Sequence, residues 1–214
     1  MISAVRGRPM RMSRPAAIVP SMSTDDLFLH ADAALRSVIE RIDPADLAKP
    51  APAEWTTRPD PTFRDIVFAH AYDEAWIPGV IAGRSITDGD EFREADLLGD
   101  DPIASYLALH DTATAAVQTG VAPGTTFRFQ YGDYPVDEGF AHLATYRAFQ
   151  AWLIAKHLGI EFHLSPELID ALNEHVVPHA DEWRQWGVFP PAIEAPDGAD
   201  AETRLLCAVG YWIP

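Results

Sequence analysis

Cysteine is almost absent from this chain of 214 residues, in which Cys207 is the only thiol. A single thiol excludes a disulfide within the chain and a metal cluster that is built from several thiolates. Long apolar runs are also missing. No stretch approaches the ~20 residues that a membrane-spanning helix needs, so none is predicted. A chain with these features suits the reducing cytoplasm, which is where we expect the protein.

Basic residues are scarce as well. The chain has 16 Lys and Arg against 32 Asp and Glu, which gives a formal net charge of −16. Affinity for a nucleic-acid backbone or for an anionic membrane surface depends on clustered basic side chains. We therefore expect neither kind of partner. A small-molecule substrate and a monomer or homodimer are the expected associations.

Apolar residues make up 48% of the chain, enough for one substantial core. We predict one helical domain over residues 23–214. Residues 1–22 are basic and hold no apolar run as long as the 7–15 residues of a signal-peptide core, so we predict a disordered arm there. Met10, Met12 and Met22 leave the true start of translation open.

Helix signals recur along the domain. Capping residues predict where helices begin, and Gly or Pro where they end. Residues 43–61 are rich in proline and predict a long loop. Pro78 is expected to kink or end the second helix. The predicted helices are 23–42, opened by Ser23 or Thr24; 63–84, opened by a Thr62–Asp65 capping box; 101–119; 135–159; 165–176; and a short terminal helix capped by Asp200.

The helix over residues 135–159 has two distinct faces. At about 100° per residue, one stripe is broadly apolar, and a second sector carries polar rings and an amide. A helix with two such faces is normally enclosed on both sides, so we expect a central member of a bundle whose second face lines a cavity. The stripe is Phe140, Leu143, Arg147, Ala151, Ile154 and Leu158; the second face is His142, Tyr146, Gln150, Leu153 and His157.

Strand signals are few. Residues 125–132 alternate Phe127 and Phe129 with polar residues, which predicts one short extended segment before the helix at 135–159. Several long helices with so little strand predict an all-α bundle. The long loop and the extended segment argue against simple up-down-up-down order. The residues after 176 form a C-terminal extension.

The helix at 63–84 carries His70 and Glu74 one turn apart on an apolar face. A buried carboxylate without a partner costs several kcal/mol, so Glu74 must be paired, protonated, metal-bound or solvated in a cavity. One interpretation is a general base, His70, that is oriented by a carboxylate. The other is a core histidine that joins two helices by bonding to Tyr146 or Glu74.

Four stretches of the chain resemble a known family. They are PAEW at 52–55, TFRDIVFAH ending at His70, AFQAWLIAKHLG at 148–159, and WGVFPPAIEAPDGADAETRLLCAVG at 186–210. In order and spacing they resemble the DinB superfamily, particularly its mycothiol-dependent maleylpyruvate isomerase-like branch, over most of residues 23–210. The resemblance implies an up-down-down-up four-helix bundle with zinc or nickel in a central pocket. It also implies thiol-dependent isomerisation or S-transfer.

The ligand pattern of that family is broken in this chain. The family's first histidine ligand falls on His70, but its two ligand positions on the last bundle helix are Tyr146 and Gln150, and Leu153 stands where an aspartate is usual. A neutral amide is a poor transition-metal ligand, and a tyrosine must first lose a proton with a pKa of about 10. We therefore favour no resident metal or other cofactor. A rearranged zinc or nickel site of His70, Glu74 and His142, working with mycothiol, is the alternative.

The favoured function is a small-molecule enzyme that uses metal-independent acid/base catalysis, such as isomerisation, addition or cyclisation. In it His70 is the general base and the Glu74 carboxylate orients it. Tyr146 donates a proton, and Gln150 forms a hydrogen bond to a carbonyl group of the substrate. The runner-up is a divalent-metal, mycothiol-dependent isomerase or S-transferase, and the third candidate is a non-catalytic binding protein. The expected substrate-binding residues are Arg147, for which a salt bridge is the competing role, His142, and Trp76 and Trp152, for which core packing is the competing role.

Overall fold

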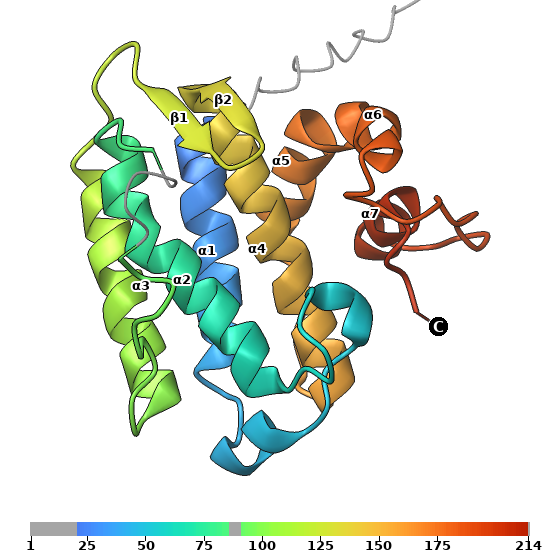
Figure 1. Ribbon diagram of the computed structural model, residues 1–214. Helices are drawn as coiled ribbons and strands as arrows, with labels where there is room; N and C mark the ends of the chain where they lie inside the picture. The colour runs from blue at the N-terminus through green and yellow to red at the C-terminus, as the bar shows by residue number, and fades with distance from the viewer. Residues whose placement is uncertain (1–20, 86–90, 214) are drawn as a thin grey trace, which may run out of the picture.

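The computed structural model describes residues 21–85 and 91–213 (Figure 1). The predicted arm at 1–22 therefore lies mostly outside the described residues. Ser21 and Met22 are described, and both contact the helix at 166–175: Ser21 Oγ donates to Glu174 at 2.7 Å, and the Met22 carbonyl lies 2.8 Å from His175 Nε2.

The described chain is mainly α-helical, with one small sheet. Its helices and strands, in order, are α1 (Thr24–Ile39), the 3-10 turns η1 (Pro44–Ala48) and η2 (Ala53–Trp55), α2 (Phe63–Ile81), α3 (Pro102–Gln118), β1 (Thr126–Phe129), β2 (Gly132–Pro135), α4 (Val136–Leu158), α5 (Pro166–His175), the 3-10 turn η3 (Val177–His179), α6 (Ala180–Gln185) and α7 (Ala201–Val209). None of the described helices is both long and apolar enough to span a membrane.

Local capping explains where the helices begin. Ser23, Asp101, Ser165 and Asp200 each accept a hydrogen bond from a backbone N–H of the first turn. The predicted Thr62–Asp65 capping box is present, and the Asp65 carboxylate accepts from the Thr62 N–H at 2.9 Å. The helix starts expected from the sequence are therefore confirmed. The ends are less regular, because α2 continues past Pro78 to Ile81.

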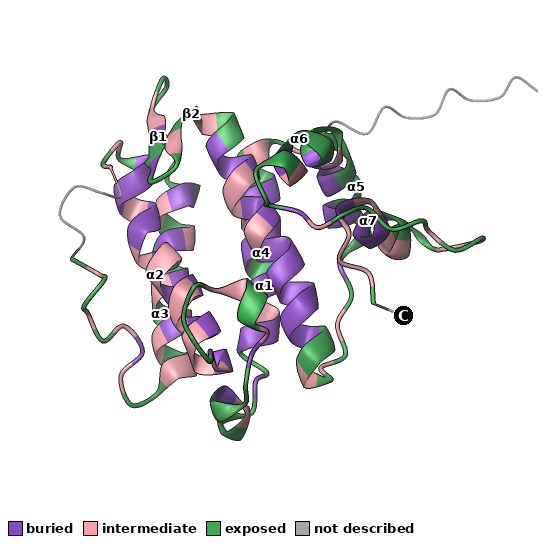
Figure 2. Ribbon diagram, turned by 45° about the vertical axis from the view of Figure 1, so that its right-hand side comes forward, coloured by how far each residue is buried: buried purple, intermediate pink, exposed green. Residues whose placement is uncertain are grey.

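The long helices pack in two pairs, α1 along α4 and α2 along α3 (Figure 1). In Figure 1, α1 and α4 run from the end that carries the small sheet towards the end that carries the proline-rich connection, and α2 and α3 run the opposite way. The C-terminal helices α5, α6 and α7 lie beyond α4. Figure 2 shows buried residues along most of α4, which is the expected central helix.

The extended segment before α4 is a hairpin and not a single strand. β1 pairs antiparallel with β2, with Phe127 opposite Tyr134. The second strand was missed because its sequence, GDYP, has no apolar alternation and ends in proline. The hairpin packs on the first turn of α4 at Gly139, where an added Cβ would lie 2.1 Å from the Phe127 ring. This contact holds the hairpin against the start of α4.

Candidate functional site

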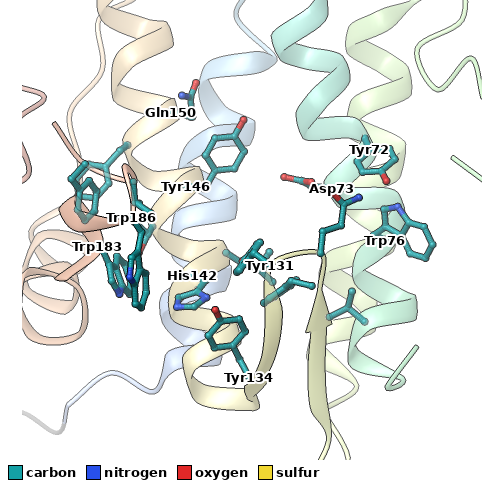
Figure 3. A pocket seen from close by; sticks show the side chains of 18 of the residues that line it. Tyr72, Asp73, Trp76, Tyr131, Tyr134, His142, Tyr146, Gln150, Trp183 and Trp186 are labelled. Atoms are coloured by element: carbon teal, nitrogen blue, oxygen red, sulfur yellow. The ribbon is translucent and has the colours of Figure 1, made fainter. Parts of the chain in front are cut away.

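A cavity of about 790 Å³ lies between α2, the hairpin, α4 and the C-terminal segment (Figure 3). This volume is in the usual range for small-molecule sites, about 300–1,000 Å³. Most of the lining is aromatic or aliphatic. The lining residues are Tyr72, Asp73, Trp76, Ile77 and Val80 from α2; Phe129, Gln130, Tyr131 and Tyr134 from the hairpin; His142, Leu143, Thr145, Tyr146, Phe149, Gln150 and Leu153 from α4; and Trp183, Trp186, Val188, Phe189 and Tyr211.

The second face predicted for α4 contributes its polar groups to this cavity. His142, Tyr146 and Gln150 line it at successive turns. His157, the last residue of that face, does not line it. Its Nδ1 lies 3.0 Å from the Leu153 carbonyl, and its ring contacts Trp55. The cavity therefore uses the first three turns of the face, and α2, the hairpin and the C-terminal segment line its other sides.

Asp73 is the carboxyl group of the cavity, and sequence reasoning missed it. It is half-buried on α2 and points towards the space in front of Tyr146 (Figure 3). Burial raises the pKa of Asp73 to about 6, although Arg147 acts in the opposite direction. The available signal was its position on the same helical face as Trp76, Ile77 and Val80. A carboxyl with this pKa exchanges protons readily near neutral pH.

Tyr146 faces Asp73 from α4. Burial raises the pKa of the Tyr146 hydroxyl, and the Asp73 carboxylate raises it further. The phenol therefore keeps its proton at neutral pH and serves as a hydrogen-bond or proton donor. A carboxylate that can accept a proton therefore faces a phenol that keeps its proton. Such a combination in one cavity is typical of acid/base sites.

Three polar atoms of the lining have no hydrogen-bond partner among the described residues. They are Gln150 Oε1, His142 Nδ1 and Trp76 Nε1, all buried. A buried polar atom without a partner costs about 1–3 kcal/mol, so a ligand that pairs with one of them gains correspondingly. His142 also lies among aromatic rings, 4.5 Å from Tyr134 and 5.1 Å from Trp183 between ring centroids. Burial lowers the pKa of His142, which favours a neutral imidazole.

The structure brings His70 against Tyr146, with the ring centroids 4.8 Å apart, but not into the cavity lining. His70 is fully buried, and neither ring nitrogen has a hydrogen-bond partner among the described residues. Burial lowers the pKa of His70 to about 3; Arg147 acts in the same direction, and Gln150 acts against it. So low a pKa makes His70 a weak base. Its expected role as general base is therefore revised to packing behind Tyr146.

Glu74 is held by Arg147, and no described hydrogen bond joins it to His70. Glu74 Oε1 accepts from Arg147 Nη2 at 3.0 Å and from Nε at 3.2 Å. Arg147 Nε also donates to Asp32 of α1 at 2.8 Å, and His110 Nε2 of α3 lies 3.2 Å from Asp32. Burial raises the pKa of Glu74 well above its ordinary value, against the effect of Arg147. The expected pairing of Glu74 with His70 is thus corrected.

Arg147 is fully buried in these ion pairs, and its guanidinium lies 4.9 Å from the Phe28 ring. It does not line the cavity, so the structural role, a salt bridge between helices, replaces the expected substrate contact. Of the two tryptophans expected to bind substrate, Trp76 lines the cavity and Trp152 does not. His110 of α3 is 5% exposed, and its Nε2 lies 3.2 Å from the Asp32 carboxylate.

The metal that the family resemblance implies does not fit the residues present. Among the described residues, no group of three or more His, Cys, Asp or Glu side chains is arranged to hold a metal ion. The alternative zinc or nickel site of His70, Glu74 and His142 in particular is not formed. The Glu74 carboxylate is hydrogen-bonded to Arg147, and the His142 imidazole packs against the rings of Tyr134 and Trp183. The two remaining family ligand positions, Tyr146 and Gln150, carry a protonated phenol and a neutral amide.

Comparisons with models of protein families, with curated proteins and with solved structures give no match to this chain. The chemistry of the cavity must therefore be derived from its own residues.

Proposed function

We propose that the protein is a small-molecule enzyme that performs acid/base catalysis in the cavity between α2 and α4. One observation carries the proposal: Asp73 and Tyr146 face one another from two helices across a largely apolar cavity (Figure 3). In this proposal the base is Asp73, in place of His70 oriented by Glu74. A DinB-like up-down-down-up bundle in the cytoplasm remains part of the proposal, and the helix directions in Figure 1 support the bundle.

The chemistry follows from the two protonation states. The Asp73 carboxylate removes a proton from a substrate carbon or nitrogen, and its apolar surroundings make it a stronger base than an aspartate in water. The Tyr146 hydroxyl donates a hydrogen bond to the oxygen on which negative charge develops, and the Gln150 amide N–H₂ supplies a second donor. Asp73 then returns its proton at another atom of the substrate. Isomerisation, addition and cyclisation all fit this sequence of steps.

Turnover by paired variants tests the proposal once a substrate has been found by screening. Asp73→Asn and Tyr146→Phe should each lower kcat by about 10²-fold or more, because each removes one proton-transfer or hydrogen-bond group. Asp170→Asn, the same change on the exposed face of α5, is the matched control and should leave turnover unchanged. Wild-type turnover in both cavity variants, with unchanged thermal unfolding, would contradict the proposal.

A non-catalytic binding protein is the second candidate, and the predominance of aromatic side chains in the lining favours it. A binder would be stabilised by its ligand without forming product. Ligand-dependent melting combined with mass spectrometry of the recovered ligand separates the two candidates, because an enzyme changes the mass or connectivity of what it binds.

A further inference from the structure

The cavity lining, all of it described, contains a carboxylate and no lysine or arginine side chain. The carboxylate is that of Asp73. Arg147, whose charge acts on Asp73, is already paired with Asp32 and Glu74 outside the lining. A bound anion would therefore meet a carboxylate and no free cation.

Aromatic rings line the rest of the cavity in stacked groups. Tyr131 stacks on Phe129 with 5.1 Å between ring centroids, and Trp183 stacks on Phe189 with 5.9 Å. Trp76 follows Asp73 on the same helix. The face of each ring carries partial negative charge, so rings around a carboxylate attract cations and repel anions.

The Asp73 carboxylate and the aromatic rings line the same cavity. Asp73 lines it from α2, and Tyr131 lines it from the hairpin (Figure 3). Gln150 Oε1, 7% exposed as a residue and without a described partner, adds a hydrogen-bond acceptor to the same lining. Both acceptors match a ligand that brings positive charge and N–H donors.

We infer that the ligand of this cavity is an organic cation, an ammonium compound whose charged group lies at Asp73 against the ring of Tyr131. The inference rests on the proposed function and names its substrate class. A cationic group next to the reacting atom also keeps Asp73 ionised, which is the form that a general base requires.

Three probes of similar size and different charge test the inference: benzylammonium, benzyl alcohol and benzoate. Their binding to the full-length protein is measured by calorimetry and by the fluorescence of the cavity tryptophans at neutral pH. The cation should bind about tenfold more tightly than the neutral probe, and benzoate should bind most weakly. Equal or tighter binding of benzyl alcohol or benzoate would overturn the inference while leaving a small-molecule pocket, and hence the proposed function, intact.

Variants locate the effect. Asp73→Asn should remove most of the preference for the cation, whereas Asp170→Asn should keep it. Tyr131 is 64% exposed, so replacing it should leave the fold intact. Tyr131→Phe keeps an aromatic ring and should retain cation binding, whereas Tyr131→Leu removes the ring and should weaken cation binding several-fold. A cation preference that survives both Asp73→Asn and Tyr131→Leu, or no cation binding at about 10 mM in the wild type, would overturn the assignment. Turnover then still tests the proposed function separately.

Discussion

Asp73 and Glu74 are neighbours in sequence, yet they serve different purposes. A step of about 100° along α2 points Asp73 into the cavity and turns Glu74 towards Arg147 in the core. Burial raises the pKa of both carboxyls, but among the described residues only Glu74 has a cation within hydrogen-bond distance. The residue with the paired charge contributes to the core, and the residue facing the cavity retains its chemistry.

Asp73 should therefore destabilise the folded protein at neutral pH. Its pKa rises from 3.8 to about 6 on folding, which corresponds to at most ~3 kcal/mol. The folded protein holds this proton more tightly than the unfolded chain, so its contribution to stability is complete below pH 3.8 and is lost as the pH rises through about 6. Asp73→Asn should raise the free energy of unfolding at pH 8 by about 1–3 kcal/mol.

Urea unfolding of the variant and the wild type at pH 4 and pH 8 checks this expectation. The difference between the two proteins should be larger at pH 8. Arg147, Glu74, Tyr131 and Tyr146 act electrostatically with Asp73, so comparison at matched pH isolates the effect of the substitution. A variant that is less stable at pH 8 than at pH 4, relative to wild type, would contradict the assigned pKa direction.

At the scale of elements, one buried ion cluster joins the long helices. Asp32 of α1, Glu74 of α2 and His110 of α3 gather around Arg147 of α4, directly or through Asp32. A buried ion pair adds little net stability to a protein. It nevertheless fixes how the helices are placed, because burying either charged group without its partner costs free energy. The placement of α2 relative to α4, and with it the shape of the cavity, depends on this cluster.

Arg147→Met should destabilise the protein by about 3–5 kcal/mol, because it leaves two buried carboxyls without a cation. Arg36→Met is the matched control. It breaks the exposed Arg36–Glu40 pair, which has a 2.9 Å contact, and should cost about 1 kcal/mol or less. Chemical denaturation measures both. Adding Glu74→Gln to Arg147→Met should recover part of the loss. Equal costs for the two arginine variants would show that the cluster is unimportant for stability.

For the whole molecule, the net charge of −16 sets the response to salt. Exposed carboxylates repel one another at neutral pH, and salt screens this repulsion over distances of about 10 Å and more. The melting temperature at pH 7.5 should rise by roughly 2–5 °C between low and 0.5 M sodium chloride. Differential scanning calorimetry provides the measurement. A fall in melting temperature would mean that the favourable surface ion pairs outweigh the overall repulsion.

Much of the fold was predictable because its signals are local. Capping residues, prolines and apolar periodicity marked the helix starts at Ser23, Thr62, Asp101 and Ser165, and these were confirmed. The two faces of α4 were visible for the same reason, since the angle between residues on one helix is known in advance. The GDYP strand carried no such signal and emerged only through its pairing with β1.

The candidate site was likewise predictable only where its signals are local. By itself, the sequence determined that α4 presents His142, Tyr146 and Gln150 together and that α2 carries carboxyls on a largely apolar helix. Which carboxyl meets the cavity was decided only by the tertiary structure, because the partner of each depends on helices that are distant in the chain. Arg147 lies 73 residues from Glu74 and 115 from Asp32. Contacts over such separations leave no periodic pattern in the sequence, and they decide which face of α2 meets the core and which meets the cavity.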